Sequence, residues 1–150
     1  MSKDYILAIN PGSTSTKIAI YNRDQEVFIT NIKHSTEQLA QFKDILDQYS
    51  FRKNFILEEL EKHKINYQDI KIIVGRGGLL RPIESGIYEI NERMIADLKK
   101  GALNTKHASN LGGLIAKDLT LIFRDAKAYI ADPPVVDEMT DLAHISGHPL

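Results

Sequence analysis

The sequence feature that most constrains the fold is an apolar segment near the N-terminus that a short polar loop interrupts. Residues 6–9 are apolar, residues 10–17 read Asn-Pro-Gly-Ser-Thr-Ser-Thr-Lys, and residues 18–21 are apolar again. A connection this short cannot cross over a sheet, so the two apolar runs are predicted to form an antiparallel hairpin. Glycine permits close backbone approach, amides and hydroxyls donate hydrogen bonds to anionic oxygens, and Lys17 adds a compact charge. The loop is therefore a candidate phosphate site.

The rest of the hydrophobic pattern predicts a mixed sheet covered by helices, an α/β fold. A third strand at 26–32 would complete an antiparallel meander, and two more strands follow at 70–74 and 127–131. Helices are predicted from a cap at Ser35 or Thr36 through Tyr49, and at 55–63, 92–100 and 108–123. The glycine- and proline-containing stretch between residues 75 and 90 is predicted to be a loop. Strands that alternate with helices after a meander indicate a mixed sheet with flanking helices.

Composition excludes several classes of partner. The formal net charge is −1, so no global field draws the chain to nucleic acid or to an anionic membrane, and any anion site must be local. The chain has no cysteine, which excludes disulfides and thiolate metal sites. No apolar run has the roughly 18 residues of a membrane span, and the first residues do not resemble a signal peptide. These observations predict a cytoplasmic protein.

The polar loop fits neither of the two common glycine-rich phosphate motifs. Lys17 does not follow a glycine, as the Walker A pattern requires, and the loop leads into a strand, whereas a dinucleotide fingerprint leads into a helix. What remains is the phosphate-binding β-hairpin of the actin, sugar kinase and heat-shock ATPase class. The alternative is an ordinary turn rich in serine and threonine.

The segment 6–17 resembles, without a break, the signature of the acetate and butyrate kinase family. The segments 73–82, 106–112 and 130–138 are similar to the butyrate kinase branch of that family, so the resemblance covers essentially the whole chain. It implies a ribonuclease H-like domain of the type found in actin, sugar kinases and heat-shock ATPases. Members of the family have two domains, so residues 1–150 are expected to be the N-terminal acetokinase-type domain, with the C-terminal domain absent.

The resemblance implies that the protein transfers a phosphoryl group between ATP and butyrate or a branched short-chain fatty acid, with Mg²⁺. The expected partners are thus the fatty acid or its acyl phosphate and ATP or ADP, with no nucleic acid and no membrane. The full-length protein is expected to be a homo-oligomer, and the isolated chain to fold but to be almost inactive. Two alternatives stay open: a non-catalytic actin-like nucleotide-binding or assembly module, and a sugar or polyol kinase.

The family's polar hairpin positions imply a set of phosphate contacts. They correspond here to Asn10, Gly12, Ser13, Ser15 and Lys17. Asn10 is also a candidate Mg²⁺ contact, directly or through water, although an asparagine before a proline also starts turns.

Asp132 aligns with the active-site aspartate of acetate kinases and is the second candidate Mg²⁺ contact. An ordinary Asp-Pro turn is the alternative reading, and Asp137 and Glu138 are expected to face solvent. His107 matches a family histidine that lies near the transferring phosphoryl group, although it also suits a helix cap.

The carboxylate-binding arginine is not settled by the resemblance, because this chain has apolar residues where acetate kinases place theirs. Arg76 stands in the segment where acetate kinases carry a histidine, and Arg81 follows it closely. A guanidinium can grip a carboxylate or a phosphate with two hydrogen bonds, so Arg76 and Arg81 are both candidates for that role. Arg76 is also a candidate catalytic residue, and an ordinary surface arginine is the alternative for each.

Overall fold

The N-terminal residues form an antiparallel meander, as their short connections predict. In the computed structural model, which describes residues 3–101 and 106–133, strand β1 (Tyr5–Pro11) pairs with β2 (Ser15–Asn22), and β2 pairs with β3 (Gln25–Lys33). Asn10 stands opposite Lys17 in the β1–β2 register. The polar loop is therefore the turn of this first hairpin.

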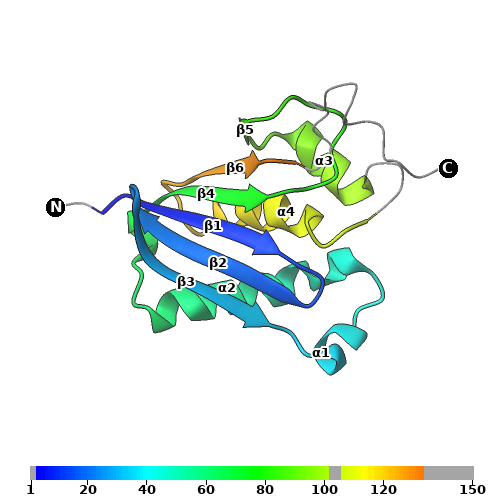
Figure 1. Cartoon of the computed structure of the whole chain (residues 1–150), viewed down its shortest axis with the longest axis horizontal. Helices are drawn as coiled ribbons and strands as arrows, with labels where there is room; N and C mark the ends of the chain where they lie inside the picture. Colours follow the sequence, from blue (N-terminus) through cyan, green and yellow to red (C-terminus); the bar gives the residue numbers. More distant parts are fainter. Residues whose placement is uncertain (1–2, 102–105, 134–150) are drawn as a thin grey trace, which may run out of the picture.

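The sheet continues in parallel on the other side of β1. Strand β4 (Ile70–Arg76) is parallel to β1, and β6 (Lys127–Ala131) is parallel to β4. A short edge strand, β5 (Ile87–Glu89), runs antiparallel to β6 and completes the order β3-β2-β1-β4-β6-β5. Parallel pairing makes the carboxyl ends of β1, β4 and β6 meet at one edge of the sheet (Figure 1).

The helices differ from the prediction in their boundaries. The structure has α1 (Thr36–Ala40), the 3₁₀ helix η1 (Ile45–Gln48), α2 (Tyr49–Lys62), the 3₁₀ helix η2 (Tyr67–Asp69), α3 (Glu92–Lys100) and α4 (Asn110–Leu119). The single helix predicted up to Tyr49 is wrong, because Asp44 begins a new helix by accepting a hydrogen bond from the backbone of Leu46. The caps predicted at Ser35 and at Asn91 are confirmed.

The core lies between the sheet and the two longest helices. Helices α2 and α4 lie behind the sheet in Figure 1, and they contact each other there. Alternate strand residues point to that side and are almost fully buried, as are the facing helix residues: Leu7, Ile9, Ile18, Ile20, Ile73, Ile130, Ile56, Leu60, Leu111 and Ile115. Burying each such side chain contributes about 2 kcal/mol before entropy is counted, so this face holds the fold together.

Helix α4 approaches β4 unusually closely because glycines face each other at the contact. A Cβ added to Gly75 would lie 2.4 Å from the carbonyl carbon of Gly112 and 2.6 Å from the nitrogen of Gly113. Both neighbours are backbone, so a side chain at Gly75 could be accommodated only by moving the helix. The glycines thereby set the N-terminal turn of α4 against the carboxyl end of β4.

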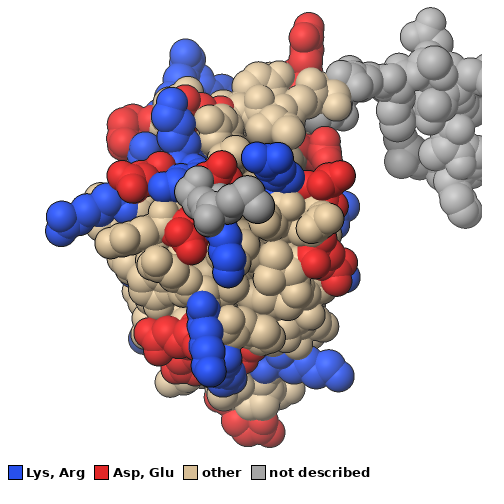
Figure 2. Space-filling model, turned by 90° about the vertical axis from the view of Figure 1, so that its left-hand side faces the viewer, with Lys and Arg blue, Asp and Glu red and all other residues tan. Residues whose placement is uncertain are grey.

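The surface at the amino ends of β1 and β4 carries charges of both signs. Figure 2 shows this side, where the side chains of Lys and Arg alternate with those of Asp and Glu. This mixture agrees with the net charge of −1 and forms no large field of one sign. Within the described residues, no helix has the length and apolar character needed to cross a bilayer.

Candidate active site

A cavity of about 530 Å³ lies where the parallel strands end. It is lined by Asn10, Pro11, Arg76, Gly77, Leu79, His107, Ser109 and Asp132. Three chain segments that are far apart in sequence meet here because β1, β4 and β6 end at the same edge of the sheet. Ligands of open α/β sheets typically bind at this edge, outside the carboxyl ends of the strands.

Four of the residues singled out from the sequence come together around this cavity. Asn10 is near the end of β1, Arg76 ends β4, Asp132 follows β6, and His107 precedes α4. Their spacing along the chain does not place them together, since at least 24 residues separate each from the next; only the family resemblance assigned them to one site. The fold therefore brings these four side chains to one cavity.

The other hairpin residues lie beside the cavity and do not line it. Gly12, Ser13, Ser15 and Lys17 form the turn and the start of β2, and the Lys17 side chain is exposed. Lys17 shares the face of the hairpin that carries Asn10, because the two residues stand opposite each other. A ligand that extended from the cavity over the hairpin would meet both.

The turn of the hairpin presents donors to solvent and hides its acceptors. The carbonyl oxygens of residues 12, 13 and 15 accept hydrogen bonds from Arg52, and that of Thr14 accepts one from the backbone of His34. The N–H of Gly12 bonds to Ser15 across the turn, 2.7 Å. Within the described part of the chain, the N–H groups of Ser13 and Thr14 donate to no protein acceptor. These two exposed amides suit an anion.

Arg52 and His34 lie beneath the hairpin, and sequence reasoning missed both. Arg52 is fully buried and His34 is 4% exposed. Burial lowers the pKa of Arg52 to about 10, and burial together with the charge of Arg52 lowers the pKa of His34 to about 4. At neutral pH the first is therefore a buried cation and the second is neutral.

Two glycines after β4 turn the chain so that Arg76 stands at the cavity. Gly77 and Gly78 have φ angles of 80° and 115°, which side chains rarely tolerate, and the N–H of Gly77 bonds to Ala131 at 3.0 Å. Arg76 is exposed and forms no ion pair with any described carboxylate. Arg81, in contrast, bonds to Asp97 at 2.8 Å and lines a different hollow.

His107 is oriented by the turn that leads into α4. Its Nδ1 accepts the backbone N–H of Ser109 at 3.2 Å and contacts the Ser109 hydroxyl at 2.9 Å. Because Nδ1 accepts that N–H, the proton of the neutral ring lies on Nε2. The ring therefore has an N–H donor to offer at the cavity, next to the N-terminus of α4.

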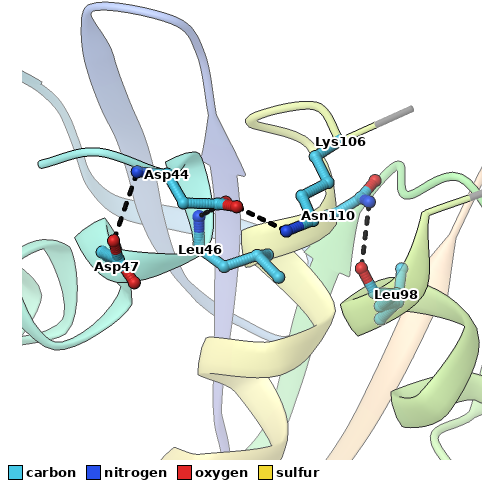
Figure 3. Close-up of polar contacts among 6 residues, drawn as sticks. All are labelled: Asp44, Leu46, Asp47, Leu98, Lys106 and Asn110. Carbon is cyan, nitrogen blue, oxygen red and sulfur yellow. Dashed lines mark hydrogen bonds and ion pairs between the residues drawn. The ribbon is translucent and has the colours of Figure 1, made fainter. Parts of the chain in front are cut away.

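Asn110 supports the wall of the cavity, a role that its sequence context did not suggest. Its side chain is fully buried, donates to the carbonyl of Leu98 at 3.0 Å and accepts the N–H of Leu79 at 2.8 Å. Figure 3 shows the contact with Leu98, and beside it the ion pair between Lys106 and Asp44. Asn110 thus ties α3, the start of α4 and the cavity-lining loop to one another.

Asp132 and Asn10 place two oxygen-bearing side chains at the cavity. Asp132 has a φ of 48°, a left-handed conformation that aspartate tolerates better than most residues, and this turns the chain directly after β6. Among the residues that the structure describes, no group of three or more His, Asp or Glu side chains is arranged to hold a metal by itself. Mg²⁺ usually takes one or two protein ligands together with water and substrate phosphates, so Asn10 and Asp132 fit it.

A larger hollow of about 610 Å³ lies elsewhere, between the start of α2, α3 and α4. It is mostly apolar and contains none of the predicted site residues. Asp137 and Glu138, which were expected to face solvent, lie outside the described residues.

Comparison with known proteins finds relatives with about half of the aligned residues identical. The chain is 49% identical over 144 residues to "Butyrate kinase 2" of Clostridium acetobutylicum and 50% identical over 145 residues to the "Probable butyrate kinase" of Bacteroides thetaiotaomicron. These alignments cover 96% and 97% of the chain. The chain is a relative of the butyrate kinases. It spans only 40% of the length of each of these two proteins. No family model matches.

Solved structures confirm the expected fold. This chain superposes on acetate kinase from Entamoeba histolytica with a TM-score of 0.52 at 16% identity, over 97% of this chain and 39% of the acetate kinase chain. It superposes on a propionate kinase from Francisella tularensis with a TM-score of 0.50 at 19% identity, over 85% of this chain and 36% of the propionate kinase chain. At such identities the likeness establishes the fold alone, which is the actin-like fold of the acetate kinases.

Proposed function

We propose that this chain contributes the phosphate-binding wall of a short-chain carboxylate kinase, which transfers a phosphoryl group between ATP and butyrate or a branched relative. The observation that carries the proposal is the meeting of Asn10, Arg76, His107 and Asp132 around one cavity beside the hairpin. Such a reaction needs two anions held in line and charge neutralised on the moving phosphoryl group. Donors, a cation and a carboxylate are the groups that this task requires.

Arg76 is proposed to hold the carboxylate substrate or the phosphoryl group. Arg76 lines the cavity and is not paired with a carboxylate of the described chain, so its guanidinium can form two parallel hydrogen bonds to a planar anion. Arg81 is already bonded to Asp97 outside the cavity, which favours Arg76 for this role.

Asn10 and Asp132 are proposed to hold Mg²⁺, directly or through water. When bound, the ion would draw the phosphate oxygens together and offset their charge. His107 would donate its Nε2–H to the transferring phosphoryl group, and the amides of Ser13 and Thr14 would bind terminal phosphate oxygens, with Lys17 beside them. Two of these groups are held before a ligand arrives: the His107 ring accepts the N–H of Ser109, and the turn that carries the amides of Ser13 and Thr14 is held through its carbonyls by Arg52 and His34.

The apolar part of the cavity is proposed to take the acyl chain. Pro11 and Leu79 supply the apolar surface, and the N–H of Leu79 is held by Asn110. A hydrocarbon chain of a few carbons would gain about 0.8 kcal/mol for each methylene that it buries there. This contribution would favour butyrate over acetate.

The chain is further proposed to be the N-terminal domain of a two-domain cytoplasmic enzyme that uses ATP and assembles as a homo-oligomer. Its match to 40% of each curated relative supports the division into domains. The remaining part of such an enzyme would supply the adenine pocket and the opposite wall of the cleft.

An acyl phosphate assay tests the proposal. The chain, extended to the length of its relatives, is incubated with ATP, Mg²⁺ and one of four acids: acetate, propionate, butyrate or isobutyrate. We expect acyl phosphate with the four-carbon acids at a higher kcat/KM than with acetate. No acyl phosphate from any acid would favour a non-catalytic nucleotide-binding module, and ATP use that requires an added sugar would favour a sugar kinase.

A further inference from the structure

Arg52 is a fully buried cation that lies directly beneath the exposed turn of the hairpin. Its Nη1 donates to the carbonyl oxygens of Gly12 at 2.7 Å and Ser15 at 2.8 Å, and its Nη2 donates to that of Ser13 at 3.1 Å. Its Nε and Nη2 also donate to Gln48, at 3.1 and 2.8 Å. The guanidinium thus binds three of the four carbonyls of the turn.

All the acceptors around this guanidinium are neutral. They are three backbone carbonyls, the amide oxygen of Gln48 and the hydroxyl of Thr16, and no carboxylate of residues 3–101 or 106–133 forms an ion pair with it. The nearby His34 cannot supply a negative charge either, because an imidazole is either neutral or positively charged. A buried charge without a partner of opposite sign costs several kcal/mol, which favours a counter-charge from outside the chain.

The contacts of Arg52 also fix which groups the turn offers to solvent. Carbonyl oxygens that faced a bound anion would repel it, and Arg52 holds those of Gly12, Ser13 and Ser15 on the inner side. The amides of Ser13 and Thr14 are consequently left on the outer side. The same side chain therefore orients the donors and places a positive charge beneath them.

We propose that Arg52 is a positioning residue of the hairpin, whose buried charge is balanced by a polyphosphate bound on the opposite side of the turn. The inference rests on the proposed function, since it deepens the assignment of the hairpin as a phosphate site. The ligand class is an inorganic or nucleoside polyphosphate. Arg52 acts through the turn and does not touch the ligand.

The test follows the backbone amide signals of Ser13 and Thr14 by nuclear magnetic resonance while inorganic tripolyphosphate is added to the ¹⁵N-labelled chain. We expect saturable shifts in the wild type, and an affinity at least about tenfold weaker in Arg52→Ala. Guanidinium ion added at low millimolar concentration should enter the space left in Arg52→Ala and restore the affinity. Urea has the same shape and no charge, so it should not.

Lys53→Ala is the matched control, because Lys53 is the next residue of α2 and pairs with Asp118 away from the hairpin at 2.5 Å. It should bind tripolyphosphate as the wild type does. If Arg52→Ala does not fold, Arg52→Lys decides the question, since a lysine keeps the charge but cannot reach all three carbonyls. We expect that variant to lose affinity about threefold or more.

The outcomes separate this inference from the proposed function. If the wild-type amides do not respond to tripolyphosphate, the hairpin is not a phosphate site, and both proposals fall. Wild-type affinity in Arg52→Ala or in a folded Arg52→Lys would refute only the role of Arg52. Rescue by urea as well as by guanidinium would show that Arg52 fills space and that its charge is not used.

Discussion

Among individual residues, the structure distinguishes two arginines that the sequence left as alternatives for holding the carboxylate. Arg76 stands at the cavity without a carboxylate partner in the described chain, and Arg81 is bonded to Asp97 in another hollow. In the sequence both lie shortly after the apolar run 70–74 and near glycines, so neither spacing nor composition could decide which one holds the carboxylate. The difference arises because Gly77 and Gly78 turn the chain between them.

Replacing Arg76 with alanine should lower kcat/KM for the carboxylate substrate about 100-fold, because two charge-assisted hydrogen bonds to an anion are lost. Arg81→Ala should change it less than about threefold, since an exposed ion pair contributes little. The measurement is acyl phosphate formation by the chain extended to the length of its relatives. Equal losses in the two variants would reject the choice of Arg76.

His34 should make stability depend on pH below neutrality. Burial and the charge of Arg52 lower its pKa from 6.5 to about 4, so the unfolded chain takes up a proton more readily than the folded one. The stabilisation is therefore complete above pH 6.5 and is lost as the pH falls from 6.5 towards 4, by about 3 kcal/mol.

The measurement for His34 is urea unfolding between pH 7.5 and about pH 4, compared with His34→Gln, which cannot titrate there. The carboxylates titrate in both proteins, so only the difference between the two slopes reports on His34. Parallel pH profiles would mean that His34 is solvated in the folded state.

Among the secondary-structure elements, glycines decide how closely α4 meets β4. Gly75 touches the backbone of Gly112, and Gly113 lies against Leu98 and Ile130. This close contact holds the N-terminal turn of α4, and with it His107 and Ser109, at the cavity. The sequence marked the glycines after β4 as a flexible loop, whereas Gly75 is part of the strand and serves packing.

Gly75→Ala should destabilise the fold by about 3 kcal/mol, because its Cβ would lie 2.4 Å from helix backbone that cannot rotate away. Gly12→Ala is the matched control: its Cβ would lie 3.4 Å from the Ser15 hydroxyl and 3.6 Å from the Ser15 carbonyl oxygen, and the free energy of unfolding should change by less than about 0.5 kcal/mol. Urea unfolding measures both. A small effect at Gly75 would show that α4 is free to shift.

For the molecule as a whole, the site is open because its residues all gather at one edge of the sheet, at the ends of β1, β4 and β6 and on the segment that leads into α4. The relatives are about two and a half times as long as this chain. A phosphoryl transfer site must exclude water on every side. A single wall can bind phosphate without being able to catalyse transfer efficiently.

The chain of 150 residues should therefore fold cooperatively but form little or no acyl phosphate, whereas the protein extended to the length of its relatives should be active. Circular dichroism with thermal unfolding tests the first statement, and the acyl phosphate assay tests the second. Robust turnover by the 150-residue chain would contradict the proposed division into two halves.

The sequence alone predicted what depends on local order along the chain. The short turns dictated the antiparallel pairing of β1, β2 and β3, and capping residues located the starts of α1 and α3. It failed at β5, which is a strand only because it pairs with the distant β6. It also failed at Asp44, a local cap that begins a new helix where the apolar spacing alone would continue the previous one.

For the site, the hairpin motif and the residues Asn10, Arg76, His107 and Asp132 could be selected from the sequence, because their types and the motif around them are local properties. That they surround one cavity was decided by the parallel pairing of β1, β4 and β6, a property of the tertiary structure. Arg52 and Asn110 could not be found in advance, because a polar side chain in a helix looks solvated until the fold buries it. The sequence specified the groups, and packing specified their neighbours.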